Sequence, residues 1–398
     1  MELDFGHGFL PRISLDNYRA VDRCVGSADL FATDRVDLPW ALVEGVCAST
    51  RPDLLATLRA NGTNTLVDTS SWRFRYEATF SVKRLAGAKW APGQVVDVCD
   101  GSQVRQLVEA SLRAQQELGA TAYLLPGWMP EHKDEDLRPA LTEIFNAAYE
   151  LNDLEARPFV AHIGGSSQGL ELMTALIDEI PHFVSALYVQ VSPIKPVGDS
   201  ASKLENLTKV YLYAASRAFK VIAGRAGALT PELRSLGVDA ADAGLGTGEA
   251  FDRSGFSRSR SQDKTEPPKG GGPRSRIYFP QLGLSLSASQ VEALLEVPAV
   301  AAELTGCRLP CHRFRSDEIL ERAREHSLWA RVTEAQNVSS LPINMRLGSV
   351  REILQQRRSA IIRINSALLE QGKTRLNVRP VDNHIVWLSR ASAGEAAA

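Results

Sequence analysis

The sequence has no long apolar run, few cysteines and no strong excess of either charge. No stretch approaches the roughly 20 consecutive apolar residues that a membrane-spanning helix needs, so we expect no membrane anchor. Residues 1–19 carry three acids and no continuous apolar segment, so we expect no secretory signal peptide. The five cysteines, an odd number at scattered positions, are not the pattern of a disulfide framework, which favours a reducing, cytoplasmic location.

The charges of the chain nearly cancel. Its 45 basic and 47 acidic residues give a net charge of −2, which excludes a protein that coats nucleic acid through a uniformly basic surface. Any basic surface must therefore be local. The length of 398 residues, with 44% hydrophobic residues, suits one large domain of about 250 residues with an appended segment.

Short apolar runs alternate with stretches of helical spacing from about residue 40 to about residue 250. This alternation predicts parallel strands connected by crossover helices. The expected strands are Ala41–Cys47, Thr63–Asp68, Gln94–Val98, Thr121–Leu125, Pro158–Ile163, Ala186–Ser192, Lys220–Ala223 and Val238–Ala243. The expected helices are Ser102–Leu118, Asp136–Leu151, Gln168–Ile180 and Ser202–Phe219. Eight strands favour an α/β fold with a closed (β/α)8 barrel of the TIM type, although a doubly wound open sheet gives the same alternation.

The composition changes after the last expected strand, which divides the chain into a barrel core of residues 1–252 and two further parts. Arg253–Arg276 holds seven basic residues against two acids and is rich in Ser, Gly and Pro, so we expect a flexible basic loop. Residues 277–398 read as a mainly helical extension that begins with an ordered segment. Its expected elements are the segment Ile277–Leu284, helices at Ala288–Leu304, Ser316–Ala335 and Val350–Glu370, a strand pair within Lys373–Leu388, and a frayed end at Ala391–Ala398.

Two aspartates lie where a barrel carries its reactive groups, at the carboxyl ends of strands. Asp68 ends the second expected strand, and the small Ser70 and Ser71 after it make room for substrate; Asp68 can equally cap the next helix. On the last expected strand, Asp242 lies nearer the carboxyl end than Asp239, and only one of the two can face the barrel mouth. We expect Asp68 and Asp242 to be catalytic.

Glycines cluster after three of the expected strands and are candidates for contact with substrate. They are Gly164 and Gly165 after His162, Gly224 after the seventh strand, and Gly244 and Gly246 after the eighth. Glycine lets the backbone approach a ligand closely, and the rim formed by the last two strands is the usual phosphate site of such barrels. The alternative is a set of glycine turns without a ligand. His162 by itself is more typical of a core residue than of a base.

A group of cysteines and histidines lies in the extension. Cys307, Cys311 and His326, with His312 or a water as the fourth ligand, could surround a structural zinc ion tetrahedrally. The alternative is that the cysteines pack without a metal.

These motifs together resemble the tRNA-guanine transglycosylase superfamily, whose members exchange guanine for 7-deazaguanine bases in tRNA or act on DNA. The segments that carry the resemblance are LVDTSSWRF, GVDAADA and the downstream Cys/His group, over roughly residues 60–330. The resemblance implies that Asp68 is the general acid/base, that Asp242 is the nucleophile, and that Cys307, Cys311 and His326 bind zinc. The segment HIGG is loosely similar to the base-reading segment of the family, without its glutamine, and the usual C-x-C-x2-C spacing is absent.

Three functions follow from these observations. The first is base exchange on guanine in tRNA or DNA, with a purine or 7-deazapurine base as the second substrate. The second is a small-molecule barrel enzyme that binds a phosphorylated substrate. The third is a catalytically silent, nucleic-acid-binding subunit. In the first and third, the basic loop would contact phosphates beside the barrel mouth. The sequence leaves open whether the chain forms a homodimer or a larger complex.

Overall fold

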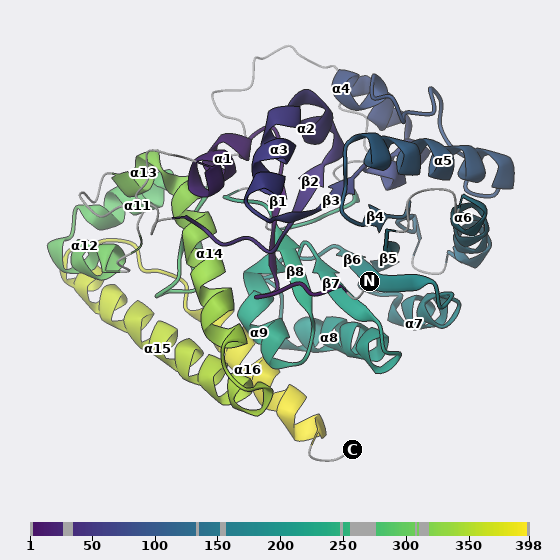
Figure 1. Cartoon of the computed structure of the whole chain (residues 1–398). Helices are drawn as coiled ribbons and strands as arrows, with labels where there is room; N and C mark the ends of the chain where they lie inside the picture. The colour runs from purple at the N-terminus through teal and green to yellow at the C-terminus, as the bar shows by residue number, and fades with distance from the viewer. Residues whose placement is uncertain are drawn as a thin grey trace, which may run out of the picture.

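The computed structural model describes residues 3–26, 35–132, 135–151, 157–246, 250–254, 276–306, 309 and 318–395. Eight parallel strands form one sheet in the order β3-β2-β1-β8-β7-β6-β5-β4, and a bridge between Leu66 and Ala122 joins its two edges. The chain is therefore an α/β barrel of the TIM type, as expected (Figure 1). The strands are β1 Phe9–Ile13, β2 Trp40–Glu44, β3 Asn64–Asp68, β4 Tyr123–Leu124, β5 Phe159–Ser166, β6 Val184–Ser192, β7 Lys220–Gly224 and β8 Ala240–Ala243.

Helices cover the outside of the barrel. The helix α5 buries an apolar face and has a conventional start, where the Asp100 side chain accepts hydrogen bonds from the backbone N–H groups of Ser102 and Gln103. The helices are α1 Tyr18–Gly26, α2 Gly45–Thr50, α3 Pro52–Ala60, α4 Lys83–Ala86, α5 Gly101–Glu117, α6 Arg138–Glu150, α7 Leu170–Asp178, α8 Ala201–Ser216 and α9 Thr230–Ser235. Short 3-10 turns are η2 Ser71–Arg75, η3 Glu77–Ser81 and η4 Gly227–Leu229.

Two of the strand assignments differ from the sequence-based expectation. Gln94–Val98 is not a strand; it is an irregular, largely exposed segment in which Val96 is buried and bonds to the Phe74 carbonyl. The missing strand is β1, which contains Pro11, a residue that strand patterns disfavour because it has no N–H to donate. Asp68 consequently ends the third strand rather than the second.

The extension begins with an antiparallel hairpin and continues as helices, of which α14 lies between the barrel and α15 (Figure 1). The expected helix at Ala288–Leu304 is interrupted, because Pro298 starts a new helix. The elements are β9 Arg276–Phe279, β10 Leu284–Ser287, α11 Ala288–Leu295, α12 Pro298–Thr305, α13 Glu318–Glu321, α14 Ala323–Ser339, α15 Ile343–Glu370 and α16 Arg379–Glu395.

The expected strand pair within Lys373–Leu388 is wrong, because α16 occupies most of it. Val381, His384 and Leu388 are buried at helical spacing, which is the pattern of one helix face packed against the rest of the protein. The expected helix at Ser316–Ala335 is represented by α13 and α14, with residues 316–317 outside the described part of the chain. Most of the expected basic loop, residues 255–275, also lies outside it.

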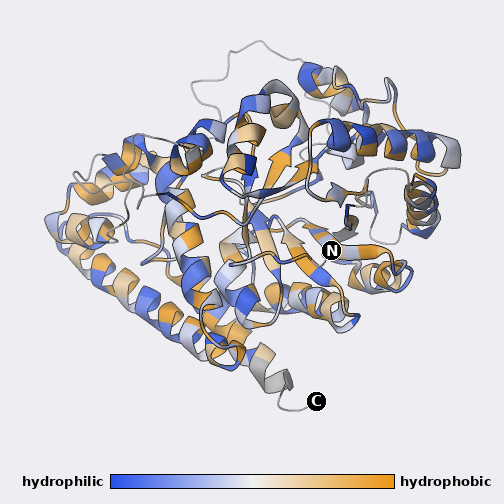
Figure 2. Cartoon of the chain, in the orientation of Figure 1, coloured by the Kyte–Doolittle hydropathy of each residue, from blue (hydrophilic) through white to orange (hydrophobic). Residues whose placement is uncertain are grey.

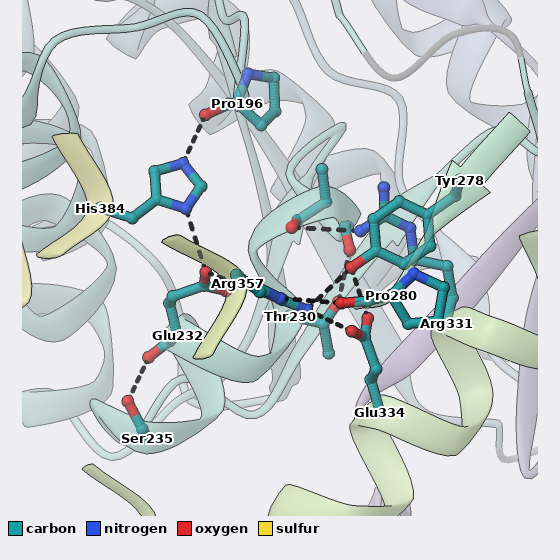
Figure 3. Close-up of polar contacts among 12 residues, drawn as sticks. Pro196, Thr230, Glu232, Ser235, Tyr278, Pro280, Arg331, Glu334, Arg357 and His384 are labelled. Atoms are coloured by element: carbon teal, nitrogen blue, oxygen red, sulfur yellow. Dashed lines mark hydrogen bonds and ion pairs between the residues drawn. The ribbon is translucent and has the colours of Figure 1, made fainter. Parts of the chain in front are cut away.

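A buried network of charged and polar groups joins the barrel to the extension (Figure 3). Glu232 on α9 lies 3.1 Å from Nδ1 of His384 on α16 and 3.9 Å from Nη1 of Arg357 on α15. Arg357 also donates to the Tyr278 hydroxyl at 3.0 Å and forms an ion pair with Glu334. Burial raises the pKa of Glu232, but His384 and Arg357 outweigh it and hold the pKa below its ordinary value.

The interior of the barrel is apolar for most of its length. Figure 2 shows the apolar residues concentrated on the central strands. The Phe5 and Trp40 rings, 5.3 Å apart, belong to the cluster that fills the barrel, together with Leu10, Leu42 and Leu66. At the carboxyl ends of the strands this apolar filling gives way to buried charged and polar side chains, and these form the candidate site. Within the described residues, none of the helices combines the length and the apolar character that crossing a bilayer requires.

Candidate active site at the barrel mouth

Arg12 is the centre of the site, although it belongs to none of the motifs identified in the sequence. It projects from β1 and is 2% exposed. Its Nη1 lies 2.5 Å from Oδ2 of Asp68 on β3, and its Nε lies 2.8 Å from Oδ2 of Asp242 on β8. Its Nη2 donates to the hydroxyl oxygen of Tyr188 on β6 at 2.7 Å. One guanidinium group thus connects side chains from four strands.

The two predicted catalytic aspartates therefore converge. Both bind nitrogens of the same guanidinium group, which are about 2.3 Å apart, so the two bound carboxylate oxygens lie within about 8 Å of each other. The second oxygen of Asp68 accepts a hydrogen bond from the Ser70 backbone N–H at 2.7 Å. The second oxygen of Asp242 accepts one from the Arg225 backbone N–H at 2.8 Å. Each of the four carboxylate oxygens has a donor.

The charges at this site stabilise one another. Burial lowers the pKa of Arg12, but Asp242, Tyr188 and Asp68 outweigh it and raise the pKa well above its ordinary value. Burial raises the pKa of Asp68, and the charge and hydrogen bond of Arg12 more than reverse that effect, so this pKa lies below its ordinary value. Burial raises the pKa of Tyr188 well above its ordinary value. At neutral pH the site therefore holds a guanidinium ion, an ionised Asp68 and a neutral phenol.

His162 on β5 lies beside this group. Its ring centroid is 5.1 Å from that of Tyr188, and its Nε2 is buried without a hydrogen-bond partner. Burial lowers the pKa of His162 to about 4, and the charge of nearby Asp68 opposes that effect only in part. The imidazole is therefore neutral at physiological pH, and its unpaired nitrogen is a polar contact that a ligand could complete.

The lowered pKa of His162 predicts a loss of stability in acid. The histidine binds a proton near pH 6.5 in the unfolded chain but only near pH 4 in the folded one, so unfolding takes up a proton between these values and stability falls as pH falls. In urea unfolding, the wild type is expected to lose roughly 2–3 kcal/mol more than His162→Phe between pH 7 and pH 4.5. His182→Phe, at an exposed position, is the control. Parallel pH curves for wild type and His162→Phe would contradict the expectation.

Three of the glycines predicted to contact substrate are instead packed against other parts of the chain. A Cβ on Gly224 would lie 2.7 Å from Cζ of Tyr188, and one on Gly164 would lie 2.1 Å from the Trp128 carbonyl oxygen. A Cβ on Gly165 would lie 1.9 Å from the sulfur of Met173. These glycines are required by close packing, and nothing in their surroundings favours the phosphate site expected at the rim of the last two strands.

The other predicted substrate-binding residues follow the two aspartates in the chain. Ser70, with a φ of 53°, forms the turn after β3, and Ser71 is buried at the start of η2. Gly244 is buried directly after β8. Gly246 has a φ of 76°, and its carbonyl accepts a hydrogen bond from Arg276 N–H at 2.8 Å, which connects the end of the barrel to β9.

Aromatic side chains cover part of the mouth. The Trp72 ring lies 5.5 Å from Phe251 and 6.5 Å from Tyr76. Arg253 donates from its backbone N–H to the Ser192 hydroxyl at 2.8 Å and from its side chain to the Tyr76 hydroxyl at 3.2 Å. Residues 250–254 therefore lie between the end of β6 and η2, so the predicted basic loop departs from the barrel mouth.

Of the predicted zinc ligands, only His326 lies within the described residues. Cys307, Cys311 and His312 lie outside the described residues, and within the described ones no three His, Cys, Asp or Glu side chains are grouped as for a metal. His326 is buried on α14, with its ring 5.6 Å from that of Phe279. Leu309, between the two cysteines in sequence, packs in one cluster with Tyr278, Trp329 and Ala330. Since Ala330 is one helical turn beyond His326, Leu309 lies against the helix that carries His326.

Comparison with known proteins adds no functional information. No family model matches the chain, and no curated protein matches it. Two solved structures of the carboxyl transferase domain of Rhizobium etli pyruvate carboxylase, one of them a variant with pyruvate, are similar at 13% and 12% identity, each with a TM-score of 0.28. They cover 98% and 96% of this chain, and the chain spans only 61% and 62% of them. A likeness this weak carries no argument about activity.

Proposed function

We propose that this protein is a base-exchange transglycosylase acting on guanine in tRNA or DNA, with Asp242 as the nucleophile and Asp68 as the general acid/base. What supports the proposal is the convergence of these two carboxylates, from strands far apart in sequence, on one guanidinium group at the carboxyl end of the barrel. Two carboxylates within reach of one nucleotide are what a double-displacement reaction at C1′ needs.

The proposed reaction has two steps. In the first, a carboxylate oxygen of Asp242 attacks C1′, the glycosidic bond breaks, and its electron pair leaves with guanine, which takes a proton from Asp68. Because Asp68 is ionised in the free protein, it must first take up that proton from solvent as Arg12 moves away from it. In the second, a nitrogen of the incoming base attacks C1′, gives its proton to Asp68 and displaces Asp242. In the free protein, Arg12 donates hydrogen bonds to both carboxylates. Substrate must therefore break the contact between Arg12 and Asp242, and protonation of Asp68 must break the contact between Arg12 and Asp68.

A different observation favours a second function, a catalytically silent barrel that binds nucleic acid. Asp242 has no exposed surface, and both of its oxygens already accept hydrogen bonds. A carboxylate held in this way would stabilise the barrel without reacting if Arg12 never releases it.

One experiment separates these functions. Purified protein is incubated with radiolabelled guanine and either tRNA or double-stranded DNA, and the label that becomes acid-precipitable is counted. Incorporation into one polymer supports base exchange and identifies the substrate. Binding of either polymer without incorporation supports the silent barrel instead.

We also propose a structural zinc ion bound by Cys307, Cys311 and His326, with His312 or a water completing the tetrahedron. The position of Leu309 beside α14 supports it. Elemental analysis is expected to give about one zinc per chain, and chelation is expected to lower the Tm because metal binding contributes to folding. Cys307→Ser should lose the metal, whereas Cys99→Ser, at an exposed free thiol, should keep it. Less than about a tenth of a zinc per chain, with an unchanged Tm in Cys307→Ser, would mean that the cysteines only pack.

A cytoplasmic location belongs to the same proposal. Cys24 and Cys47 are buried free thiols, and burial raises the pKa of each to about 12, so they are unreactive side chains of the core rather than halves of disulfides.

A further inference from the structure

A second concave site lies beside the barrel mouth. It is a cavity of about 890 Å³ between the loop after β6, the segment after β8, the β9–β10 hairpin and the linker from α15 to α16. Gly246 and Ala250, which follow Asp242 in the chain, form part of its wall. Part of the cavity wall therefore follows directly, in the chain, the strand β8 that carries the proposed nucleophile.

The charged side chains of this cavity are all cations. Lys195, Arg276 and Arg375 line it, and among the described residues of the wall there is no acid. Asp199, four residues after Lys195, accepts the Lys195 backbone N–H at 2.9 Å and forms an ion pair with Lys203 at 3.0 Å. The guanidinium of Arg276 donates to the Ser285 carbonyl at 3.1 Å. Within the described part of the chain, none of the three cations forms an ion pair with a carboxylate.

The backbone at these cations is held in place. Arg276 N–H donates to the Gly246 carbonyl at 2.8 Å, and Arg276 pairs with Ser287 in the hairpin. The linker that carries Arg375 is fixed at the next residue, where Leu376 N–H donates to the Asn365 side-chain oxygen at 2.6 Å and the Leu376 carbonyl accepts from the same side chain at 2.9 Å. Three exposed cations thus line one cavity from fixed backbone positions, an arrangement that attracts an anion.

We propose that this cavity binds phosphate groups of a single-stranded stretch of the nucleic acid whose target nucleotide enters the barrel mouth. The inference rests on the proposed function in one respect, namely that a polynucleotide reaches the mouth. Cations without carboxylate partners bind phosphodiesters irrespective of sequence, and polar side chains position the strand. The wall supplies such groups in Ser285, Ser287, Gln290 and Asn377. The base-exchange step itself needs none of these residues.

The test measures binding of fluorescein-labelled 20-nucleotide single strands of RNA and of DNA by fluorescence anisotropy over a series of salt concentrations. The variant replaces all three cations, as Lys195→Gln, Arg276→Gln and Arg375→Gln. For the strand that the wild type prefers, we expect affinity at 100 mM salt to fall by at least about tenfold. The slope of log K against log salt should become shallower by roughly 2, since each neutralised phosphate of a single strand contributes about 0.7.

A control variant carries the same change in net charge. Lys89→Gln, Arg113→Gln and Lys209→Gln remove three exposed cations that are paired with Glu117, Glu109 and Glu205 on the outside of the barrel. This variant should bind as the wild type does. Equal losses in both triple variants, no loss in the cavity variant, or no binding of either strand by the wild type would each overturn the proposal.

The assay of guanine incorporation makes the two proposals distinguishable. If the cavity variant loses strand binding while the wild type incorporates no guanine, the phosphate site stands and base exchange fails. If the wild type incorporates guanine and the cavity variant binds strands with wild-type affinity and salt dependence, base exchange stands and the phosphate site fails.

Discussion

Asp242→Asn is expected to reduce guanine exchange by roughly 10⁴-fold or more, the scale on which loss of a covalent nucleophile slows an enzyme. The neutral amide cannot displace the base and hold C1′ as an ester. Its oxygen can still accept the Arg225 N–H, and its size is unchanged, so the barrel should stay folded. The measurement is the initial rate of incorporation of labelled guanine at saturating polymer.

Asp239→Asn is the matched control for this variant. Asp239 lies three residues earlier in the chain, and its carboxylate accepts the Val221 N–H at 2.9 Å and lies 3.3 Å from Lys220, away from Arg12. It should exchange guanine at close to the wild-type rate. An Asp242→Asn variant that turns over as fast as Asp239→Asn would remove Asp242 from the mechanism.

Arg12→Met is expected to destabilise the protein by about 3–5 kcal/mol, because two buried carboxylates then lose the cation that compensates them. Methionine fills much of the space of the arginine stem, so the loss reflects charge more than volume. Urea unfolding at pH 7, followed by tryptophan fluorescence, measures the change in the free energy of unfolding.

A triple variant tests that explanation. Adding Asp68→Asn and Asp242→Asn to Arg12→Met removes the uncompensated charges and should recover a substantial part of the lost stability, because buried ion pairs can be replaced by neutral groups at little cost. The free energy of unfolding of Arg12→Lys should lie between those of the wild type and Arg12→Met. Lysine keeps the positive charge, but its ammonium group cannot reproduce the planar guanidinium that contacts three side chains. If Arg12→Met lowers the free energy of unfolding by less than about 1 kcal/mol, the buried carboxylates do not need Arg12 to compensate their charge.

The sequence predicted the parts of this site that depend on strand order. Asp68 and Asp242 follow apolar runs, and a parallel barrel brings the carboxyl ends of all its strands to one face, so their proximity follows from the fold class alone. The sequence pattern does not identify Arg12 as a buried site residue, for two reasons. Its strand contains Pro11, which weakens the strand pattern, and a single arginine in sequence looks like a surface residue. The available signal was the apolar segment FLPRI, in which Arg12 is the one charged position.

Side-chain partnerships between distant strands could not be predicted from the sequence in the same way. Tyr188 contacts Arg12 across 176 positions of sequence, and only the closure of the sheet determines that they meet. The glycines show a different limit of the sequence. Gly164 and Gly224 suggested an open backbone, whereas Trp128 and Tyr188 occupy the space that each leaves. A glycine indicates that other atoms pack closely against its Cα. The sequence does not show whether those atoms belong to a ligand or to another part of the chain.

The buried network between barrel and extension has a consequence for how the protein forms on the ribosome. Glu232 belongs to the last third of the barrel, but His384, its partner on α16, is made 152 residues later. At roughly 5–20 residues per second, about 8–30 seconds pass between the synthesis of Glu232 and that of His384. The contacts of this buried network are therefore complete only after α16 has been synthesised.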